Sequence, residues 1–314
     1  MFHWNSVTLS DIILIMNVKY PLLIDGGLSY VLENQGCDLN HKLWSAKLLE
    51  TDPEAIVKAH TTYLNSGARC IITSSYQASI PGFIEIGYTI AEAKKLLLKS
   101  VELAQIAIND FSKKVNYKPL IAASIGSYGA YLADGSEYHG NYMVSDEMLY
   151  EFHLDRIQLL DSSKADFFAC ETIPSFKEAK VLSEILKQTN KSAWISFSCK
   201  DGNSLNDGTK IDQCASFFSN HPKIIAIGVN CTDPKYISSL IKLIKTKSKE
   251  KKIVVYPNSG ETYHSMSKTW SGGSKFDFVS SVQQWLALGA DIVGGCCRVG
   301  PRQISSINEI LKEA

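Results

Sequence analysis

The stretch Ile-Ile-Ala-Ile-Gly-Val-Asn-Cys at positions 224–231 contains the unit that decides the fold. It is a short and almost continuously apolar run, which is typical of a parallel strand that is covered on both faces. The run ends in Asn and Cys, and Asp233-Pro234 follows, with a helix-capping residue before a proline suited to the first helical turn. The sequence therefore predicts a buried strand, a polar loop and then a helix.

Seven further stretches repeat this pattern of a short apolar run followed by a helical pattern. Together the eight predicted strands are Pro21 to Gly27, Ala68 to Tyr76, Pro119 to Ser127, Ala165 to Thr172, Ser192 to Cys199, Ile224 to Cys231, Lys252 to Gly260 and Asp291 to Cys297. Eight is the number of parallel strands that closes a barrel when the strands alternate with amphipathic helices. We therefore predict the α/β class, with a single (β/α)8 TIM barrel domain over residues 1–314.

Capping motifs mark where helices begin. Asp52-Pro53 places a cap residue before a proline suited to the first helical position. Thr89-Ile-Ala-Glu92 and Ser175-Phe-Lys-Glu178 both match the capping box, in which each of the two terminal side chains bonds to the other residue's backbone amide. After Thr89, apolar side chains recur every three or four residues, at Ile90, Ala93, Leu97, Val101, Ala104, Ile108 and Phe111. This spacing predicts a helix that packs one face against the sheet.

Composition excludes several classes of protein. The 314 residues contain 32 Lys plus Arg and 32 Asp plus Glu, so no net charge attracts nucleic acid or an anionic membrane. The apolar stretch Ile12 to Val18 is too short to span a membrane, and we recognise no signal peptide. Scattered cysteines without the density of a disulfide scaffold are typical of a reducing compartment. We expect a cytoplasmic protein that binds small molecules, and we leave its oligomeric state open.

Three of the eight cysteines lie where predicted strands end. Cys231 closes the sixth strand, and the adjacent pair Cys296-Cys297 closes the eighth. In a barrel these strand ends lie on one face, and thiolate sulfur is a preferred ligand of Zn²⁺. Three thiolates fill three of four tetrahedral positions, which is the arrangement of a catalytic zinc site with one position open. Gly294-Gly295 gives the backbone the freedom that adjacent cysteines need to reach one metal.

The alternative is that these cysteines are packing residues, because cysteine is among the most buried residue types. We assign packing to the other five, which are Cys37, Cys70, Cys170, Cys199 and Cys214. No Cys-x-x-Cys pair supports metal binding, so spacing alone leaves both interpretations open. A disulfide between Cys296 and Cys297 is a third interpretation.

Six blocks of the sequence resemble the homocysteine S-methyltransferase family, and the resemblance runs nearly end to end. The blocks are Leu-Leu-Ile-Asp-Gly-Gly-Leu (22–28), Ala-Ser-Ile-Gly-Ser-Tyr-Gly-Ala-Tyr-Leu-Ala-Asp-Gly-Ser-Glu-Tyr (123–138), Cys-Glu-Thr-Ile-Pro (170–174), Gly-Val-Asn-Cys (228–231), Tyr-Pro-Asn-Ser-Gly-Glu (256–261) and Gly-Gly-Cys-Cys-Arg (294–298). The resemblance implies a zinc enzyme that methylates the sulfur of homocysteine to give methionine. It also implies that Cys231, Cys296 and Cys297 are the metal ligands.

The resemblance leaves the donor and the acceptor range open. The block at 123–138 is most similar to members that use a sulfonium donor, either S-methylmethionine or S-adenosylmethionine. Betaine-using relatives carry a C-terminal extension that we do not find here, and selenocysteine methyltransferases share the same motifs. A barrel that binds zinc or a sulfonium metabolite without turnover is a further alternative, because fold does not define activity.

The resemblance also assigns residues to the amino acid part of homocysteine. Asp25 and Glu171, at the ends of strands one and four, match the carboxylates that bind the ammonium group. By chemistry alone, Asp25 could instead cap a turn, and Glu171 could pair with a basic side chain. We expect Ser124 and the backbone amides as far as Gly126 to bind the substrate carboxylate.

Other polar and aromatic residues at the same rim receive supporting roles. We expect Asn230 to orient Cys231. We expect tyrosines to surround a sulfonium by attraction between the cation and the ring faces, the candidates being Tyr76, Tyr128, Tyr138 and Tyr256. His60 and His221 belong to no catalytic triad, and we interpret both as packed or solvated residues.

Overall fold

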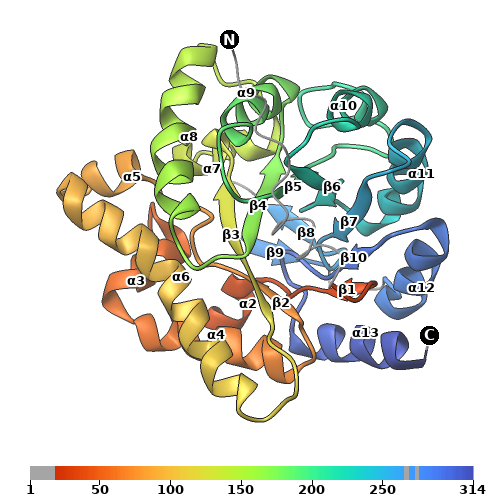
Figure 1. The fold of residues 1–314 in the computed structure, drawn as a ribbon, viewed down its shortest axis with the longest axis horizontal. Helices are drawn as coiled ribbons and strands as arrows, with labels where there is room; N and C mark the ends of the chain where they lie inside the picture. The colour runs from red at the N-terminus through yellow and green to blue at the C-terminus, as the bar shows by residue number, and fades with distance from the viewer. Residues whose placement is uncertain (1–17, 265–268, 273–275, 314) are drawn as a thin grey trace.

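The computed structural model describes residues 18–264, 269–272 and 276–313. Its main sheet contains eight parallel strands in the order β1-β10-β7-β6-β5-β4-β3-β2 (Figure 1). The strands are β1 (Leu22–Leu23), β2 (Cys70–Ile72), β3 (Leu120–Gly126), β4 (Phe167–Ile173), β5 (Ala193–Phe197), β6 (Ile224–Asn230), β7 (Lys252–Tyr256) and β10 (Ile292–Val293). A parallel bridge between Ile24 and Cys70 joins β1 to β2 and closes the ring. The predicted (β/α)8 barrel is confirmed.

In the described part of the chain, eight helices form the outer layer around this ring (Figure 1). They are α4 (Pro53–Asn65), α6 (Ile90–Ser112), α8 (Asp146–Asp161), α9 (Phe176–Leu186), α10 (Ile211–Phe218), α11 (Ile237–Lys247), α12 (Phe278–Leu288) and α13 (Pro301–Glu313). Short helices lie in the connections, namely α2 (Leu28–Asn34), η1 (Trp44–Lys47), α3 (Leu48–Thr51), α5 (Ile80–Ile84), α7 (Tyr128–Leu132), η2 (Ser136–Tyr138) and η3 (Pro234–Tyr236). Within the part of the chain that the structure describes, no helix is long and apolar enough to span a bilayer.

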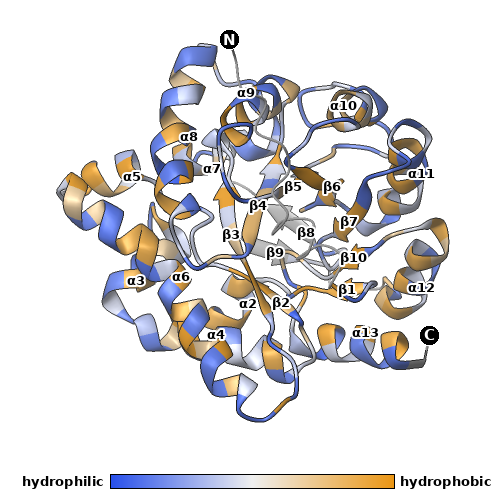
Figure 2. Cartoon of the chain, in the orientation of Figure 1, coloured by the Kyte–Doolittle hydropathy of each residue, from blue (hydrophilic) through white to orange (hydrophobic). Residues whose placement is uncertain are grey.

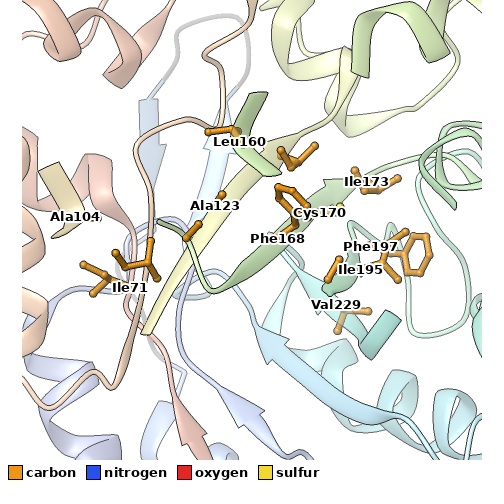
Figure 3. Packing of buried hydrophobic residues seen from close by; sticks show 14 of the residues in the cluster. Ile71, Ala104, Ala123, Leu160, Phe168, Cys170, Ile173, Ile195, Phe197 and Val229 are labelled. Carbon is orange, nitrogen blue, oxygen red and sulfur yellow. The ribbon is translucent and has the colours of Figure 1, made fainter. Parts of the chain in front are cut away.

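The alternation of side chains along each strand builds two apolar layers. Phe167 and Ala169 of β4 point into the barrel, where they join a cluster that includes Trp194. Phe168 and Cys170, one residue further along in each case, belong to the larger cluster between the strands and the helices (Figure 3). The strands are largely apolar in colour, and the helices around them carry both apolar and polar residues (Figure 2). The barrel interior is therefore filled with side chains, and only the strand ends are free to form a site.

Most of the observed strands end earlier than predicted at their polar ends, whereas β4 runs one residue further, to Ile173. β2 ends at Ile72, because residues 73–77 form a turn instead of continuing to Tyr76. β7 ends at Tyr256, because Pro257 has no backbone N–H to donate to the neighbouring strand. An antiparallel hairpin of β8 (Thr262–His264) and β9 (Thr269–Ser271) lies in the connection after β7, and the sequence did not predict it.

One of the two predicted capping boxes is confirmed, and the other is wrong. At the start of α6, the Thr89 amide donates to Glu92 at 2.8 Å, and the Glu92 amide donates to the Thr89 hydroxyl at 3.3 Å. At the start of α9, the Glu178 amide donates to the Ser175 hydroxyl at 3.1 Å. The carboxylate of Glu178 does not accept from the Ser175 amide, because it is buried beside His153 of α8.

The other helix predictions hold with small differences. Asp52 caps α4 and accepts from the Ala55 amide at 3.1 Å, and Asp233 caps η3, which leads into α11. On α6, the predicted apolar face is buried except for Ile90, whose exposed fraction is 56% because it lies in the first turn.

Candidate functional site

Three cysteines meet at the carboxyl ends of β6 and β10, the strands on either side of β7. The Sγ atoms of Cys231, Cys296 and Cys297 all lie within 4.8 Å of one another, and those of Cys231 and Cys297 are 3.8 Å apart. The other four buried cysteines lie elsewhere, whereas Cys37 is half-buried and lines the cavity described below. The structure thus separates the predicted cluster from four of the five cysteines assigned to packing, whereas Cys37 both packs against the core and lines the cavity.

Local backbone geometry brings these cysteines together. Cys231 has φ +47°, a left-handed conformation that ends β6 abruptly. Before Cys296, a side chain on Gly294 would approach Ile24 Cγ1 to 2.4 Å, and one on Gly295 would approach Val299 Cγ1 to 2.1 Å. Only glycine fits at these two positions, so the chain can pass close to β1 and turn both following cysteines toward Cys231.

The electrostatics of the cluster favour a single thiolate. Hydrogen bonds from Cys231 and Cys296 hold the pKa of Cys297 well below its ordinary value. The same interactions, together with burial, raise the pKa of Cys231. Three buried thiolates at these distances repel one another, so their simultaneous ionisation requires a cation between them. The all-sulfur cluster is therefore a candidate metal centre.

A cavity of about 930 Å³ lies over the cysteine cluster and contains two of the predicted substrate carboxyls. Asp25 Oδ2 accepts from the Ile72 amide at 2.9 Å, and Glu171 Oε1 accepts from the Ser124 hydroxyl. Burial raises the pKa of Asp25 well above its ordinary value and raises the pKa of Glu171 to about 8. Among the described residues, neither group has a buried cationic partner, and a ligand cation would favour their ionised forms.

The raised pKa of Glu171 predicts a dependence of stability on pH in metal-free protein. The folded-state pKa of Glu171 is about 8, above its ordinary value of 4.5. The protonated Glu171 side chain therefore makes its full contribution to the free energy of unfolding below pH 4.5, and this contribution is lost as pH rises through 8. Glu171→Gln does not titrate, so we expect its stability relative to the unaltered protein to increase across this window. The gain is at most about 1.4 kcal/mol per unit of pKa shift. Urea denaturation at both ends of the window measures it, and a constant difference would contradict the raised pKa.

Sequence analysis missed Ser74, which lines the cavity in the turn after β2. Its hydroxyl is buried and has no hydrogen-bond partner. Among the described residues, the backbone amides of Ser74 and Ser75 donate to no protein acceptor either. The turn therefore offers donors to an anionic ligand group. No sequence motif identifies this serine.

Ser124 and Asn230 lie behind the cavity wall instead of lining it. The amide of Ser124 already donates to Thr73 Oγ1 at 3.0 Å, so it is not available for a substrate carboxylate. Asn230 accepts from the Thr172 amide at 2.7 Å, and its Nδ2 lies 3.8 Å from Cys296 Sγ. The expectation that Asn230 orients Cys231 is therefore corrected, because its amide contacts Cys296.

Three of the four predicted tyrosines line the cavity, and one does not. Tyr76, Tyr138 and Tyr256 lie on its wall, together with Trp44, which sequence analysis missed. The rings of Trp44 and Tyr76 pack edge to face at 6.3 Å. Tyr128 lies behind the wall, where its ring packs against Phe152 at 5.0 Å, so its predicted contact with a sulfonium is wrong. His60 and His221, which we interpreted as packed or solvated residues, are both buried.

The fold and the site together define a class of protein. It is a (β/α)8 barrel enzyme whose thiol cluster and buried carboxyls face one cavity at the carboxyl ends of the strands, where such barrels hold their active sites. The family model for homocysteine S-methyltransferase matches residues 22–311. The chain belongs to this family, and it is therefore an enzyme that methylates homocysteine.

Curated relatives and solved structures agree with this assignment. Homocysteine S-methyltransferase YbgG of Bacillus subtilis is 47% identical over 296 residues, which cover 92% of this chain and 94% of that protein. Selenocysteine methyltransferase of Astragalus bisulcatus is 44% identical, with 92% of each chain covered. The metallated form of the homocysteine methyltransferase MmuM from Escherichia coli has a TM-score of 0.85 at 36% identity, covering 95% of this chain and 98% of that one. The apo form of MmuM has a TM-score of 0.75.

Proposed function

We propose that this enzyme transfers a methyl group from a sulfonium donor to the thiolate of homocysteine in a zinc-dependent reaction that yields methionine. The observation that carries the proposal is the convergence of Cys231, Cys296 and Cys297 beside Asp25 and Glu171 in one cavity. This arrangement offers a place for a sulfur nucleophile and, next to it, carboxylates for the ammonium group of the same amino acid.

The cysteine cluster fits a zinc ion. A tetrahedral site with Zn–S bonds of about 2.3 Å separates its sulfur ligands by about 3.8 Å, which matches the distance of 3.8 Å between Cys231 and Cys297. Thiolate ligands favour zinc over magnesium or calcium, which prefer oxygen. When bound, zinc supplies a Lewis acid that lowers the pKa of a thiol at its fourth position. Because these thiolates must stay reduced, we place the enzyme in the cytoplasm.

Different residues around the cavity bind the ammonium group and the carboxylate group of homocysteine. Asp25 and Glu171 receive the ammonium group, whose charge compensates for the burial of their carboxylates. Ser74 and the amides of its turn donate to the carboxylate. Ser124 holds Glu171 in place, and Asn230 supports Cys296 from behind.

The methyl transfer itself needs no general acid to protonate the leaving group. An electron pair of the homocysteine thiolate forms a bond to the methyl carbon, and the bond between that carbon and the donor sulfur breaks. The bonding electrons return to the donor sulfur, which leaves as a neutral thioether and needs no proton. The protein must therefore align sulfur, carbon and sulfur, which the walls of the cavity can do.

The charge of the cavity supports a cationic donor. Among the described residues, its walls carry six carboxyl side chains, from Asp25, Glu33, Asp38, Asp134, Glu137 and Glu171, against the basic side chains of Arg298 and His41. Four of these carboxyl groups lie outside the proposed acceptor site, and a field of this sign attracts a sulfonium, which carries a fixed positive charge. The aromatic side chains of Tyr76, Tyr138 and Trp44 add polarisable ring faces to the same walls.

The donor assay tests this proposal. Initial rates are measured with homocysteine, zinc and equal concentrations of S-methylmethionine, S-adenosylmethionine or betaine. We expect methionine from the sulfonium donors, with S-methylmethionine preferred, and none from betaine, whose quaternary nitrogen is a poorer leaving centre. Turnover with betaine alone would overturn the sulfonium proposal. If none of the three donors supported methionine formation, the proposed reaction would be refuted.

Selenocysteine is a second candidate acceptor, because the Astragalus bisulcatus selenocysteine methyltransferase is as similar to this chain as several homocysteine methyltransferases are. The ammonium and carboxylate groups of the two acceptors are the same, so Asp25, Glu171 and Ser74 would serve both. The ratio of kcat/KM for the two acceptors decides between them.

A further inference from the structure

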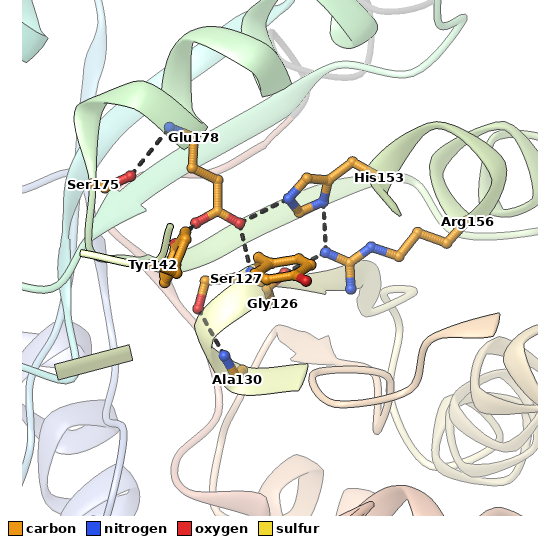
Figure 4. Close-up of polar contacts among 9 residues, drawn as sticks. Gly126, Ser127, Ala130, Tyr142, His153, Arg156, Ser175 and Glu178 are labelled. Carbon is orange, nitrogen blue, oxygen red and sulfur yellow. Dashed lines mark hydrogen bonds and ion pairs between the residues drawn. The ribbon is translucent and has the colours of Figure 1, made fainter. Parts of the chain in front are cut away.

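A buried charged cluster lies behind the cavity, between α8 and α9 (Figure 4). Its members are Glu178, His153 and Arg156, and the exposed fractions of the Glu178 and His153 side chains are both 0%. His153 Nε2 lies 2.8 Å from Glu178 Oε1, and Arg156 Nη2 lies 2.6 Å from His153 Nδ1. None of the three lines the cavity, so the proposed reaction does not use them directly.

The order of contacts fixes where the protons lie. Arg156 can only donate, so His153 Nδ1 accepts and His153 Nε2 donates to Glu178. Burial and the neighbouring guanidinium lower the pKa of His153 to about 4, which keeps the ring neutral. The cluster is therefore a carboxylate and a guanidinium joined through a neutral imidazole. A compensated buried cluster of this kind holds its members in one arrangement.

This cluster fastens the segment between β3 and α8 at three points. At the beginning of the segment, Arg156 donates to the carbonyl of Gly126, and the amide of Tyr128 donates to Glu178 Oε1 at 2.5 Å. Near its end, the hydroxyl of Tyr142 donates to Glu178 Oε2. Glu178 thus contacts both ends of the segment 127–142 with one carboxylate.

The middle of the same segment faces the cavity. The residues of the segment that line it are Ala133, Asp134, Gly135, Glu137 and Tyr138. The segment is also tightly folded on itself, since a side chain on Gly129 would approach the Glu137 amide to 2.6 Å. A shift at its fastened ends would therefore move the lining residues as a unit.

We propose that Glu178 is a positioning residue that sets the donor side of the cavity by holding the segment 127–142. This inference rests on the proposed function, because it assigns the sulfonium donor to the wall formed by residues 133–138. The acceptor amino acid is held by Asp25, Glu171 and Ser74, which lie on other strand ends and do not contact Glu178. Glu178 should therefore control donor affinity without controlling acceptor affinity or metal content.

Tyr142→Phe tests the proposal with the smallest change, because it removes one hydroxyl and leaves the buried charges paired. We expect the KM for S-methylmethionine to rise about fivefold to tenfold. This is less than the full effect of losing a charge-assisted hydrogen bond, because Tyr142 holds the segment and does not itself line the cavity. The kcat, the KM for homocysteine and the zinc content should stay within about twofold. Tyr150→Phe is the matched control, because its hydroxyl accepts an exposed hydrogen bond from Gln188 at 3.1 Å and does not reach Glu178. We expect this control to change nothing.

Glu178→Gln extends the test, because the amide keeps the shape of the side chain and can no longer accept at both positions. We expect a larger rise in donor KM than for Tyr142→Phe, and faster hydrogen exchange in the segment 127–142. A purely structural role would lower thermal stability and the active fraction without changing either KM. Unchanged donor KM in both folded variants, or an equal rise in homocysteine KM, would overturn the proposal.

Hydrogen exchange tests the positioning role of Glu178 independently of the proposed function, because it does not depend on turnover. If the unaltered enzyme used neither sulfonium donor, the proposed function would fail. The assignment of residues 133–138 as a donor wall would then fail with it. The exchange data would still show whether Glu178 fastens the segment, and unchanged exchange in Glu178→Gln would refute that step as well.

Discussion

Replacing Cys297 with serine is expected to remove zinc and to lower the methylation of homocysteine by more than about a hundredfold. Loss of residues that only support metal ligands already costs about 10- to 100-fold, so loss of a ligand should cost more. Cys297 lies 3.8 Å from Cys231, and a serine hydroxyl is a weaker ligand than a thiolate for this soft site. Zinc content by metal analysis and the initial rate measure the two effects, and the same result is expected for Cys231→Ser and Cys296→Ser.

The control for this prediction is Cys214→Ser. Cys214 is fully buried on α10, away from the cavity, so zinc content and rate should both be retained in the folded variant. Cys70 is less suitable as a control, because it lies inside the barrel close to Asp25. Full zinc occupancy in the Cys297→Ser protein would remove this residue from the metal centre.

Asp25→Asn and Glu171→Gln are each expected to weaken the binding of homocysteine about 10- to 100-fold while zinc stays bound. Each substitution removes a charge-assisted hydrogen bond to the ammonium group, which contributes about 1.5 to 3 kcal/mol. The amide replacements keep the shape of the side chains, and Asn at position 25 can still accept from the Ile72 amide. Calorimetric titration with homocysteine, alongside metal analysis, measures both quantities.

Glu33→Gln provides the comparison for these variants. Glu33 also lines the cavity, but its side chain is half-exposed at the rim beside Arg298. Solvent screens such a charge, so homocysteine affinity should change little. If Asp25→Asn and Glu171→Gln both bound homocysteine as tightly as the unaltered enzyme, neither residue would belong to the acceptor site.

The sequence predicted the barrel well because its signals are local. Each strand is an apolar run of buried residues, and the capping motifs at Thr89 and Asp52 act within one helical turn. The predicted strand ends were too long where a turn or a proline interrupts pairing, as after Ile72 and Tyr256. Pairing depends on the neighbouring strand, which the pattern along one strand does not contain.

The parts of the site that were missed depend on distant partners. Glu178 matches a capping box by spacing, yet its carboxylate pairs with His153, which comes from the preceding helix. Ser74 is one of several serines, and only the folded structure shows that its hydroxyl is buried without a partner at the cavity. Tyr128 belongs to the same segment as cavity-lining residues, which begin at Ala133, but its own ring packs against Phe152 in helix α8.

The order of strands around the barrel has a consequence for how the enzyme matures. β10 pairs with β1, so the first and last strands of the ring meet, and Asp25 and Cys296 lie on the two sides of this junction. The proposed metal centre therefore cannot form until β10 and its cysteine pair have been synthesised. A ligand that binds only the closed ring also shifts the folding equilibrium toward it. Metal loading would then act as a checkpoint that separates completed barrels from partly synthesised chains.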